Sequence, residues 1–345
     1  MLNNPQINRN IEHLVELGKR LKTSETLQDD IITAGHKNTW FTPTFVQLAI
    51  DAIAKDMLNE HNLNKWLEYY EQNDNLRPVN KTIGLIFAGN IPLVGFHDFL
   101  CCYVAGCKVK VKLSSKDDTL FSTVLNILFE IDPEAAGKIQ IVDTLKDFDA
   151  VIATGSDNTN RHFEYYFRNY PKILRKNRNS VAILTGEETT EQLELLADDI
   201  FLYFGFGCRN VSKLYVPAGY DLTILFPRFG KYKWLHQHGK YMNNYDYNRT
   251  LLLLNKTPHL ANEFIALVEN ESIPSPISNL HYQFWQDEKL LNEHLAANAD
   301  KIQCIVSGDN SRWALVPFGQ SQSPQLWDYA DGVDTMKFLL SLNQK

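Results

Sequence analysis

Apolar residues recur at helical spacing through the first eighty residues of the chain. The pair Thr42-Pro43 provides a cap and a first-turn residue for one of these helices. A polar stretch at residues 73–80 then separates the helices from the rest of the chain. The spacing predicts an N-terminal helical segment, whose clearest stripe is formed by Ile7, Ile11, Leu14 and Leu21.

After residue 80 the pattern changes to short apolar strands that alternate with amphipathic helices. Residues 108–113 alternate Lys-Val-Lys-Val-Lys-Leu, which is the period of two that a strand requires. Alternation of strands and helices indicates a parallel sheet covered by helices on both faces. Strands are expected at 82–87, 108–113, 139–142 and 150–153, and helices at 92–105, 117–130 and 157–169.

A second series of the same kind occupies the later half of the chain. A proline and a basic run interrupt the pattern between Pro171 and Asn179, which favours a domain boundary there. We therefore expect an α/β fold of two Rossmann-like parallel-sheet domains, residues 1–175 and 176–345. In the second domain we expect strands at 180–184, 213–216, 251–254, 302–306 and 313–316, helices at 189–203 and 259–269, and a proline-rich loop at 272–276.

Composition and charge narrow the class of protein. The chain of 345 residues is 44% hydrophobic and 22% charged, and its net charge of −7 argues against nucleic acid as the main partner. No apolar run reaches the ~18 residues of a membrane span, and the polar N-terminus is unlike a signal peptide. The five cysteines and the His236-Gln237-His238 run lack disulfide or metal-ligand spacing, so we expect a cytoplasmic protein without a metal site.

The run of residues 204–212, Phe-Gly-Phe-Gly-Cys-Arg-Asn-Val-Ser, is the strongest candidate for chemistry. Gly205 and Gly207 remove side-chain bulk on the approach to Cys208, so a substrate carbonyl can come close. The neighbouring Arg209 is a cation, which favours the reactive thiolate. On this run alone two interpretations are open: a nucleophile, or a buried cysteine that packs as a small apolar residue.

Three further segments come directly after predicted strands, at the edge where open α/β sheets bind ligands. Asn90, within residues 88–92, can donate to an oxyanion, or Gly-Asn is only a turn pair. Lys112, at the start of residues 112–115, can bind ribose hydroxyls or a phosphate, or it is one more solvated lysine. Thr154-Gly155-Ser156 precedes a helix and can seat a pyrophosphate, or it is an ordinary helix cap.

In this order, the segments resemble the aldehyde dehydrogenase superfamily, and within it the acyl-CoA reductases related to the bacterial luminescence fatty-acid reductase subunit (LuxC-like). The resemblance runs from about Lys81 to the C-terminus. Five short motifs carry it: Asn90-Ile91-Pro92 for the family's Asn-Phe-Pro, Val111-Lys112-Leu113-Ser114-Ser115 for Leu-Lys-Pro-Ser-Glu, Thr154-Gly155-Ser156 unchanged, Gly207-Cys208 for the nucleophile, and Pro317-Phe318-Gly319 for the late Pro-Phe-Gly.

The resemblance implies an aldehyde dehydrogenase-like fold and a role for each motif. Cys208 would attack the substrate carbonyl, and Asn90 with the Cys208 backbone amide would stabilise the oxyanion. A nicotinamide cofactor would bind to the first domain, whereas the second would be catalytic. Family members pair through a late strand, so residues 334–342 are expected to form one in a homodimer or larger assembly. The implied cofactor contacts are Lys112, Ser114 and Ser115 at the adenosine side and Thr154, Gly155 and Ser156 at the pyrophosphate.

Departures from the family pattern refine the expected reaction. The Glu that activates water in hydrolytic members falls on Leu174, so an acyl thioester should persist until hydride or a thiol arrives. Ser115 replaces a carboxylate that would repel a 2′-phosphate, which favours NADPH and leaves NADH possible. Asn160 stands where many members have a second glycine. The family's later nicotinamide-ribose Glu has no assigned counterpart, with Glu271 as the candidate.

These departures favour an acyl-CoA reductase, which converts an acyl-CoA or related acyl thioester to an aldehyde with NADPH through an acyl-cysteine intermediate. A reductase of acyl phosphates, or another aldehyde dehydrogenase, is one alternative. An inactive subunit that keeps the fold is a second, favoured by Asn160 and the unassigned ribose Glu. The basic run of residues 175–178 is either a contact for coenzyme A phosphates or a solvated loop.

Overall fold

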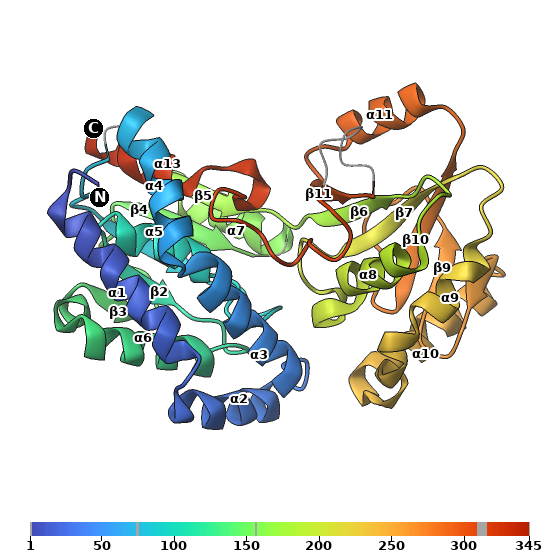
Figure 1. The fold of residues 1–345 in the computed structure, drawn as a ribbon, viewed down its shortest axis with the longest axis horizontal. Coiled ribbons are helices and arrows are strands. Elements are labelled where there is room, and N and C mark those ends of the chain that lie inside the picture. The colour runs from blue at the N-terminus through green and yellow to red at the C-terminus, as the bar shows by residue number, and fades with distance from the viewer. Residues whose placement is uncertain (1, 74–75, 156, 309–315, 345) are drawn as a thin grey trace. The chain divides into compact units, whose positions relative to one another are not determined.

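The computed structural model describes residues 2–73, 76–155, 157–308 and 316–344. The chain forms two compact units, Met1–Lys176 with Pro324–Lys345 and Asn177–Ser323. Each unit contains a sheet of largely parallel strands covered by helices (Figure 1). Among the described residues, no helix combines the length and the apolar character that crossing a membrane would require.

The N-terminal helical segment of the first unit is confirmed. Thr42 caps its third helix, because the Thr42 hydroxyl oxygen accepts a hydrogen bond from the Phe45 N–H at 3.3 Å. The stripe predicted for the first helix is buried, and Ile7 and Leu14 have no exposed surface. The helices are α1 (Pro5–Leu21), α2 (Glu25–Lys37), α3 (Pro43–Ala52) and α4 (Glu60–Asn73).

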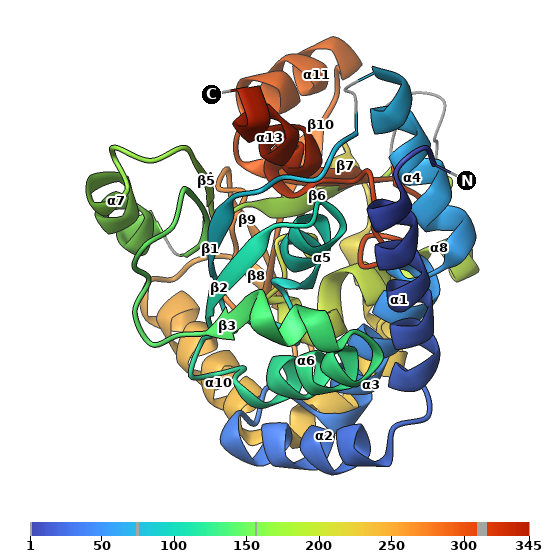
Figure 2. The same cartoon turned by 90° about the vertical axis from the view of Figure 1, so that its left-hand side faces the viewer.

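The sheet of the first unit has the strand order β3-β2-β1-β4-β5, and all these neighbours pair in parallel. Its strands are β1 (Thr82–Ile86), β2 (Lys108–Lys112), β3 (Ile139–Ile141), β4 (Ala150–Thr154) and β5 (Lys172–Arg175). Its helices are α5 (Phe96–Val104), α6 (Thr119–Ile131) and α7 (Asp157–Tyr166). Helix α5 packs against β1 and β2, and α1 packs against α5 and α6 (Figure 2). The carboxyl ends of β1, β2 and β4 therefore share one edge of the sheet.

Helix α5 begins at Phe96 rather than at Pro92, where the sequence predicted its start. Leu93 has a φ of 55°, a left-handed conformation that cannot continue a right-handed helix. The four residues before α5 therefore form a turn between β1 and the helix. Cys101 and Cys102 lie inside α5 and are buried, as the apolar pattern predicted.

The second unit has the strand order β11-β6-β7-β10-β9-β8, in which β8 and β9 are antiparallel and the other neighbours are parallel. Its strands are β6 (Asn179–Ile183), β7 (Val211–Pro217), β8 (His259–Ala261), β9 (Ala266–Glu269), β10 (Asn279–Trp285) and β11 (Ile302–Val306). Its helices are α8 (Thr190–Phe201), α9 (Leu225–Arg228), α10 (Gly239–Leu254) and α11 (Glu288–Ala297). The predicted architecture of two parallel sheets with covering helices is thus confirmed.

The strand predicted at residues 251–254 is wrong. These four leucines are the last turn of α10, which His238 caps by accepting a hydrogen bond from the Tyr241 N–H. A short apolar run has no periodicity of its own, so strand and helix cannot be separated without its context. The context here is a helix of 16 residues.

The helix predicted at residues 259–269 is also wrong, because this segment forms the β8–β9 hairpin. Asn262 turns the chain: its Oδ1 accepts hydrogen bonds from the N–H groups of Phe264 and Ile265, both at 2.9 Å. Such a side-chain turn competes with helix formation. Of the strand predicted at 313–316, only Val316 is described, and it forms a parallel bridge with Val306.

The expected late strand at residues 334–342 is a helix instead, α13 (Thr335–Ser341), and it belongs to the first unit. The Asp334 carboxylate caps it by accepting a hydrogen bond from the Lys337 N–H at 2.8 Å. The apolar residues of this segment have helical rather than alternating spacing, and they pack toward α5. The buried ones are Met336, Leu339 and Leu340.

Candidate active site

Asn90 lies in the loop after β1, at the carboxyl edge of the first unit's sheet, and its side chain is exposed. The preceding Gly89 is buried against the loop after β2. A Cβ atom at Gly89 would lie 2.6 Å from Ser114 Oγ and 2.8 Å from the Lys116 Cβ, which no side chain can accommodate. Glycine at position 89 therefore brings the loop of Asn90 into contact with the loop of Ser114.

Lys112, Ser114 and Ser115 line a cavity of about 630 Å³ at the end of β2. Lys37 of α2 reaches the same cavity, and its Nζ lies 2.9 Å from both Asp118 Oδ1 and Thr119 Oγ1. The lining is mixed in charge. Its other charged members are Asp30, Asp118 and Asp143.

Thr154 and Gly155 come at the end of β4, and Ser156 lies outside the described residues. A Cβ at Gly155 would lie 3.0 Å from atoms of Thr159 and Phe163, so this glycine lets the first turn of α7 close tightly. Asn160, which replaces a family glycine, is buried. Its Nδ2 donates to the Gly155 carbonyl at 3.2 Å and to the Arg175 carbonyl at 2.8 Å, so it fixes the turn that a glycine would leave open.

Residues 175–178 were expected either to contact coenzyme A phosphates or to form a solvated loop. Neither interpretation describes Arg175, because only 3% of its surface is exposed. Its guanidinium donates to Asp98 Oδ1 at 2.7 Å and to the Thr335 hydroxyl at 2.6 Å, joining β5, α5 and α13. Burial would raise the pKa of Asp98, yet its bonds to Arg175 hold that pKa below the ordinary value. Arg175 therefore forms a buried ion pair with Asp98 that stabilises the fold. Leu174, which the resemblance placed at the family's water-activating Glu, precedes Arg175 in β5.

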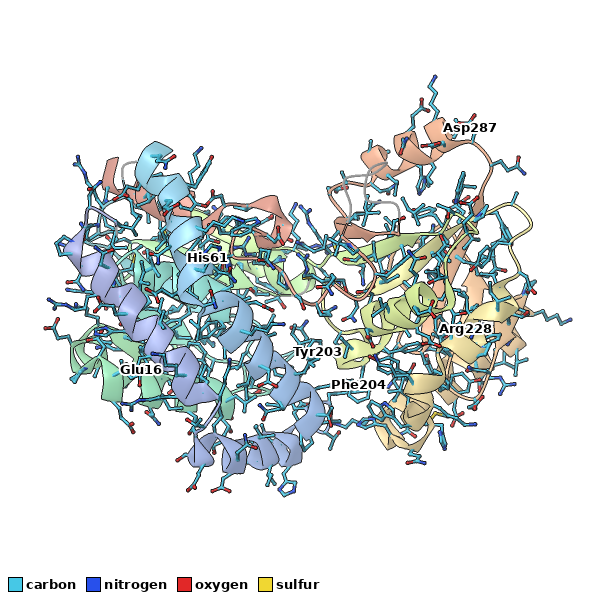
Figure 3. All side chains as sticks on the ribbon, viewed as in Figure 1. Glu16, His61, Tyr203, Phe204, Arg228 and Asp287 are labelled. Carbon is cyan, nitrogen blue, oxygen red and sulfur yellow. The ribbon has the colours of Figure 1, made fainter. Side chains whose placement is uncertain are left out.

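In the second unit, Cys208 comes after α8 on a turn with unusual backbone geometry. Tyr203, Phe204 and Gly205 have φ values of 53°, 57° and 79°, so three consecutive residues are left-handed. Figure 3 labels the large side chains of Tyr203 and Phe204. Both are buried, and their left-handed backbone costs about 1–3 kcal/mol per residue. Contacts with surrounding residues must hold such a turn in place. The Cys208 side chain that follows it is half-buried.

Asn210 supplies many of these contacts. Its Oδ1 accepts a hydrogen bond from the Gly207 N–H at 2.8 Å. Its Nδ2 donates to the carbonyls of Asp199 at 3.1 Å and Leu202 at 2.8 Å, which satisfies the carboxyl end of α8. The side chain is 1% exposed. One buried amide thus ties the residue before Cys208 to the end of the preceding helix.

Asp199 and Arg209 attach the late Pro-Phe-Gly segment to the same turn. The buried Asp199 carboxylate accepts hydrogen bonds from the N–H groups of Gly319 at 2.6 Å and Ser321 at 2.9 Å. Burial raises the pKa of Asp199 to about 6, although these two bonds oppose the rise. Arg209 Nε donates to the Ser321 carbonyl at 2.5 Å, and the Ser180 hydroxyl donates to the Cys208 carbonyl at 3.1 Å.

Lys213 organises the loop that contains Glu271. Its side chain is buried, and its Nζ donates to the Glu271 carbonyl at 2.7 Å and to Gln283 Oε1 at 2.8 Å. Burial lowers the pKa of Lys213 to about 8, with the Glu271 carboxylate opposing the change. The Glu271 side chain itself is exposed. The Lys213 ammonium group therefore fixes the backbone of this loop at Glu271, while the Glu271 carboxylate stays exposed.

A match to a family model shows which protein family the chain belongs to. Residues 17–224, more than half of the chain, match the model described as Acyl-CoA reductase (LuxC). The chain belongs to the LuxC acyl-CoA reductase family. It is accordingly an enzyme of this oxidoreductase class. A search of curated proteins gives no match to this LuxC-family chain.

Solved structures with the same fold as this LuxC-family enzyme are aldehyde dehydrogenases. An aldehyde dehydrogenase of Mycobacterium tuberculosis, complexed with NAD+, has 12% identity and a TM-score of 0.65 over 90% of this chain and 75% of its own. The indole-3-acetaldehyde dehydrogenase of P. syringae has 13% identity and a TM-score of 0.67 over 90% and 74%. The succinic semialdehyde dehydrogenase of Streptococcus pyogenes, in complex with NADP+, has 14% identity and a TM-score of 0.65 over 88% and 77%.

The structure brings the predicted residues of the LuxC-family enzyme together in two groups. The loops of Asn90, Lys112 and Gly155 lie along one edge of the first sheet, whereas Cys208 and the 317–319 segment are joined in the second unit. Residues that position these loops escaped the sequence analysis. Asn210 lies in the predicted nucleophile run, but no spacing in the sequence indicates its bonds to Gly207 and to the end of α8. The partners of Asp199, Gly319 and Ser321, are distant in sequence.

Proposed function

We propose that this enzyme reduces an acyl-CoA to the corresponding aldehyde with NADPH, and that Cys208 is the nucleophile. The observation that supports this role most directly is the Cys208 turn. A half-buried thiol follows three left-handed residues, 203–205, by three positions. Hydrogen bonds to Asn210 and from Ser180 fix the backbone of Gly207 and Cys208. Backbone strain of this kind clusters at active sites, which supports a chemical role for the cysteine that follows it.

In the proposed reaction, the Cys208 thiolate attacks the thioester carbonyl of acyl-CoA. Asn90 and the Cys208 backbone amide stabilise the oxyanion that forms, and coenzyme A leaves as its thiolate, so the acyl group is now bound to Cys208. A bound nicotinamide supplies the hydride that reduces this acyl group. The resulting thiohemiacetal then releases the aldehyde, and the Cys208 thiolate is regenerated.

Hydrolysis of the acyl-cysteine would compete with reduction if a carboxylate activated water. Leu174 takes the position of the family's Glu and cannot act as a base. Asp199, the buried acid nine residues before Cys208, has each oxygen engaged by a backbone N–H. Both observations support a thioester intermediate that persists until reduction.

The loops at the edge of the first sheet fit a dinucleotide. Gly89 and Gly155 let these loops pack closely against neighbouring residues of the chain, and a cavity opens beside Lys112, Ser114 and Ser115 at the sheet edge. We propose that Lys112 and Ser114 bind the adenosine side and that Thr154, Gly155 and Ser156 bind the pyrophosphate. Ser115 leaves room for a 2′-phosphate, so NADPH is the proposed cofactor, and NADH can also enter.

The decisive experiment is to incubate the protein with a panel of acyl-CoAs without reductant and to measure its intact mass. The expected result is a single acyl adduct that peptide mapping assigns to Cys208, and aldehyde release once NADPH is added. A parallel incubation with acyl phosphates tests the neighbouring reductase activity. Absence of any adduct, or NADPH consumption by a Cys208→Ala protein, would refute the proposal.

The family resemblance also supports a cytoplasmic enzyme that assembles as a homodimer or larger. Pairing through a strand at 334–342 is not its basis, because α13 occupies that segment. Light scattering coupled to size-exclusion chromatography measures the assembly directly. A mass of one chain across the micromolar range would contradict the proposed homodimer.

A further inference from the structure

The turn after Asn90 contains a residue in an unfavourable conformation. Leu93 is buried and has a φ of 55°, a region that branched side chains rarely occupy. Its carbonyl accepts a hydrogen bond from the Phe96 N–H at 2.9 Å, which starts α5. Its own N–H donates to Asp117 Oδ2 at 2.7 Å. A single carboxylate thus holds the strained residue three positions after Asn90.

Asp117 belongs to the other loop of the proposed site. The Asp117 N–H donates to the Ser114 carbonyl at 3.0 Å, and the same pair forms an isolated antiparallel bridge. Since Gly89 packs against Ser114 and Lys116, the two loops touch on both sides of Asn90. Asp117 is therefore the side chain that hydrogen-bonds across from the Lys112 loop to the Asn90 loop.

The Asp117 carboxylate is held in an environment that disfavours it. The residue is 8% exposed. Its Oδ1 is buried and has no hydrogen-bond partner among the described residues. Burial raises the pKa of Asp117 to about 6; the Leu93 N–H opposes this rise and Asp118 adds to it. A half-satisfied buried acid is destabilising, so its contact with Leu93 must contribute something that an apolar residue could not.

We propose that Asp117 is a positioning residue for the oxyanion donor: by fixing the Leu93 amide, it sets the path of residues 90–93 and thereby the place of the Asn90 side chain. The inference rests on the proposed function, in which Asn90 stabilises the oxyanion. Asp117 does not touch substrate. Its effect should therefore appear only through Asn90.

The test measures the single-turnover rate of Cys208 acylation by acyl-CoA, using rapid quenching and intact mass. Asp117→Ala should slow acylation by about 10- to 100-fold, a large part of the loss expected for removing the donor itself. Asp117→Asn keeps an oxygen that can accept from the Leu93 N–H, so it should stay within about threefold of the parent. Asp117→Ala combined with Asn90→Ala should be no slower than Asn90→Ala alone.

Two outcomes would overturn the positioning role. One is an Asp117→Ala protein that acylates at the parent rate. The other is a slowing that persists undiminished in the Asn90→Ala background, because a general structural defect would act there too. Should Asp117→Ala fail to fold, Asp117→Leu has a side chain of similar size without an acceptor for the Leu93 N–H, and the same slowing is expected. A parent protein that forms no adduct would instead refute the proposed function, and the role of Asp117 with it.

Discussion

The turn at Cys208 and the loops at the edge of the first sheet are held in place by different means. Around Cys208, two buried side chains engage six backbone groups. Asn210 binds the Gly207 amide and the carbonyls of Asp199, Ile200 and Leu202, and Asp199 binds two amides of the late segment. At the sheet edge, two loops meet through a glycine contact and the Asp117–Leu93 bond. More side-chain hydrogen bonds fix the backbone around Cys208 than join the Asn90 loop to the Ser114 loop.

This difference fits what each region would do in the proposed reaction. A nucleophile must keep its geometry within a fraction of an ångström through bond making and breaking, so extra hydrogen bonds that oppose backbone strain are useful. A cofactor edge must admit and release a dinucleotide in every cycle. Exposed side chains such as Lys112 and Ser115 suit that exchange. Mutation of Cys208 should therefore abolish chemistry, whereas mutation of Lys112 or Ser115 should weaken cofactor binding. Asn90 is the exception at the sheet edge, because its proposed role is in the chemistry.

Cys208→Ala should show the largest effect, a complete loss of both acyl adduct and aldehyde formation. The reason is that the proposed covalent intermediate forms on the Cys208 thiol, which this variant lacks. Cys304→Ser is the matched control, since Cys304 is the other half-buried cysteine in the described part of the second unit. Intact mass and NADPH oxidation with acyl-CoA measure both variants. An equal loss in the two proteins would mean that structural damage, rather than the thiol, explains the result.

Asn90→Ala comes next, with acylation slowed by about 10²–10³ in a protein that remains folded. The Asn90 side chain is exposed, so its removal leaves no cavity and should barely change thermal stability. The measurement is the single-turnover acylation rate together with the melting temperature. A slowing of less than threefold would show that Asn90 belongs to the cofactor edge alone.

The sequence predicted the architecture because its signals were local. The Thr42-Pro43 cap and the alternation at residues 108–113 are each contained within a few neighbours, and the structure has both elements in place. The failures required context: the leucines at 251–254 continue a helix that begins at Gly239, and the Asn262 turn overrides a helical apolar pattern. Elements with weak patterns, such as the central strand β10, were not predicted at all.

Site residues divide in the same way. Cys208, Lys112 and Asn90 could be nominated from motifs, because glycines and strand ends surround them. Asp117 and Asp199 could not be nominated in this way. Each carboxylate accepts a hydrogen bond from a backbone N–H that is distant in sequence. Leu93 lies 24 positions from Asp117, and Gly319 lies 120 positions from Asp199. No periodicity or spacing records such partners. The positioning residues therefore emerge only from the folded chain.

Asp199→Asn should change how stability depends on pH. The pKa of Asp199 rises from 3.8 to about 6 in the native state, so the native protein binds a proton there more tightly than the unfolded chain does. The protonated Asp199 stabilises the native protein, and this contribution is complete below pH 4. As pH rises through 6 the contribution is lost, and the free energy of unfolding falls by about 3 kcal/mol. Relative to the parent, Asp199→Asn should therefore gain that amount between pH 4 and pH 7, measured by urea unfolding. A constant offset across this range would contradict the raised pKa.

Lys112→Ala should produce the smallest effect, and it addresses the sheet edge. If Lys112 contacts the adenosine side of the cofactor, its loss removes about one charge-assisted hydrogen bond, which corresponds to roughly a tenfold increase in the KM for NADPH. The acylation rate of Cys208 needs no cofactor and should stay unchanged. Lys108→Ala is the matched control, because Lys108 is an exposed lysine at the opposite end of the same strand.

Measuring both variants with NADH as well shows which group Lys112 binds. A lysine that binds the 2′-phosphate would matter less for NADH, whereas one that binds ribose hydroxyls would matter equally for both cofactors. If Lys112→Ala instead slowed acylation, the two regions would not divide the labour of binding and chemistry as proposed.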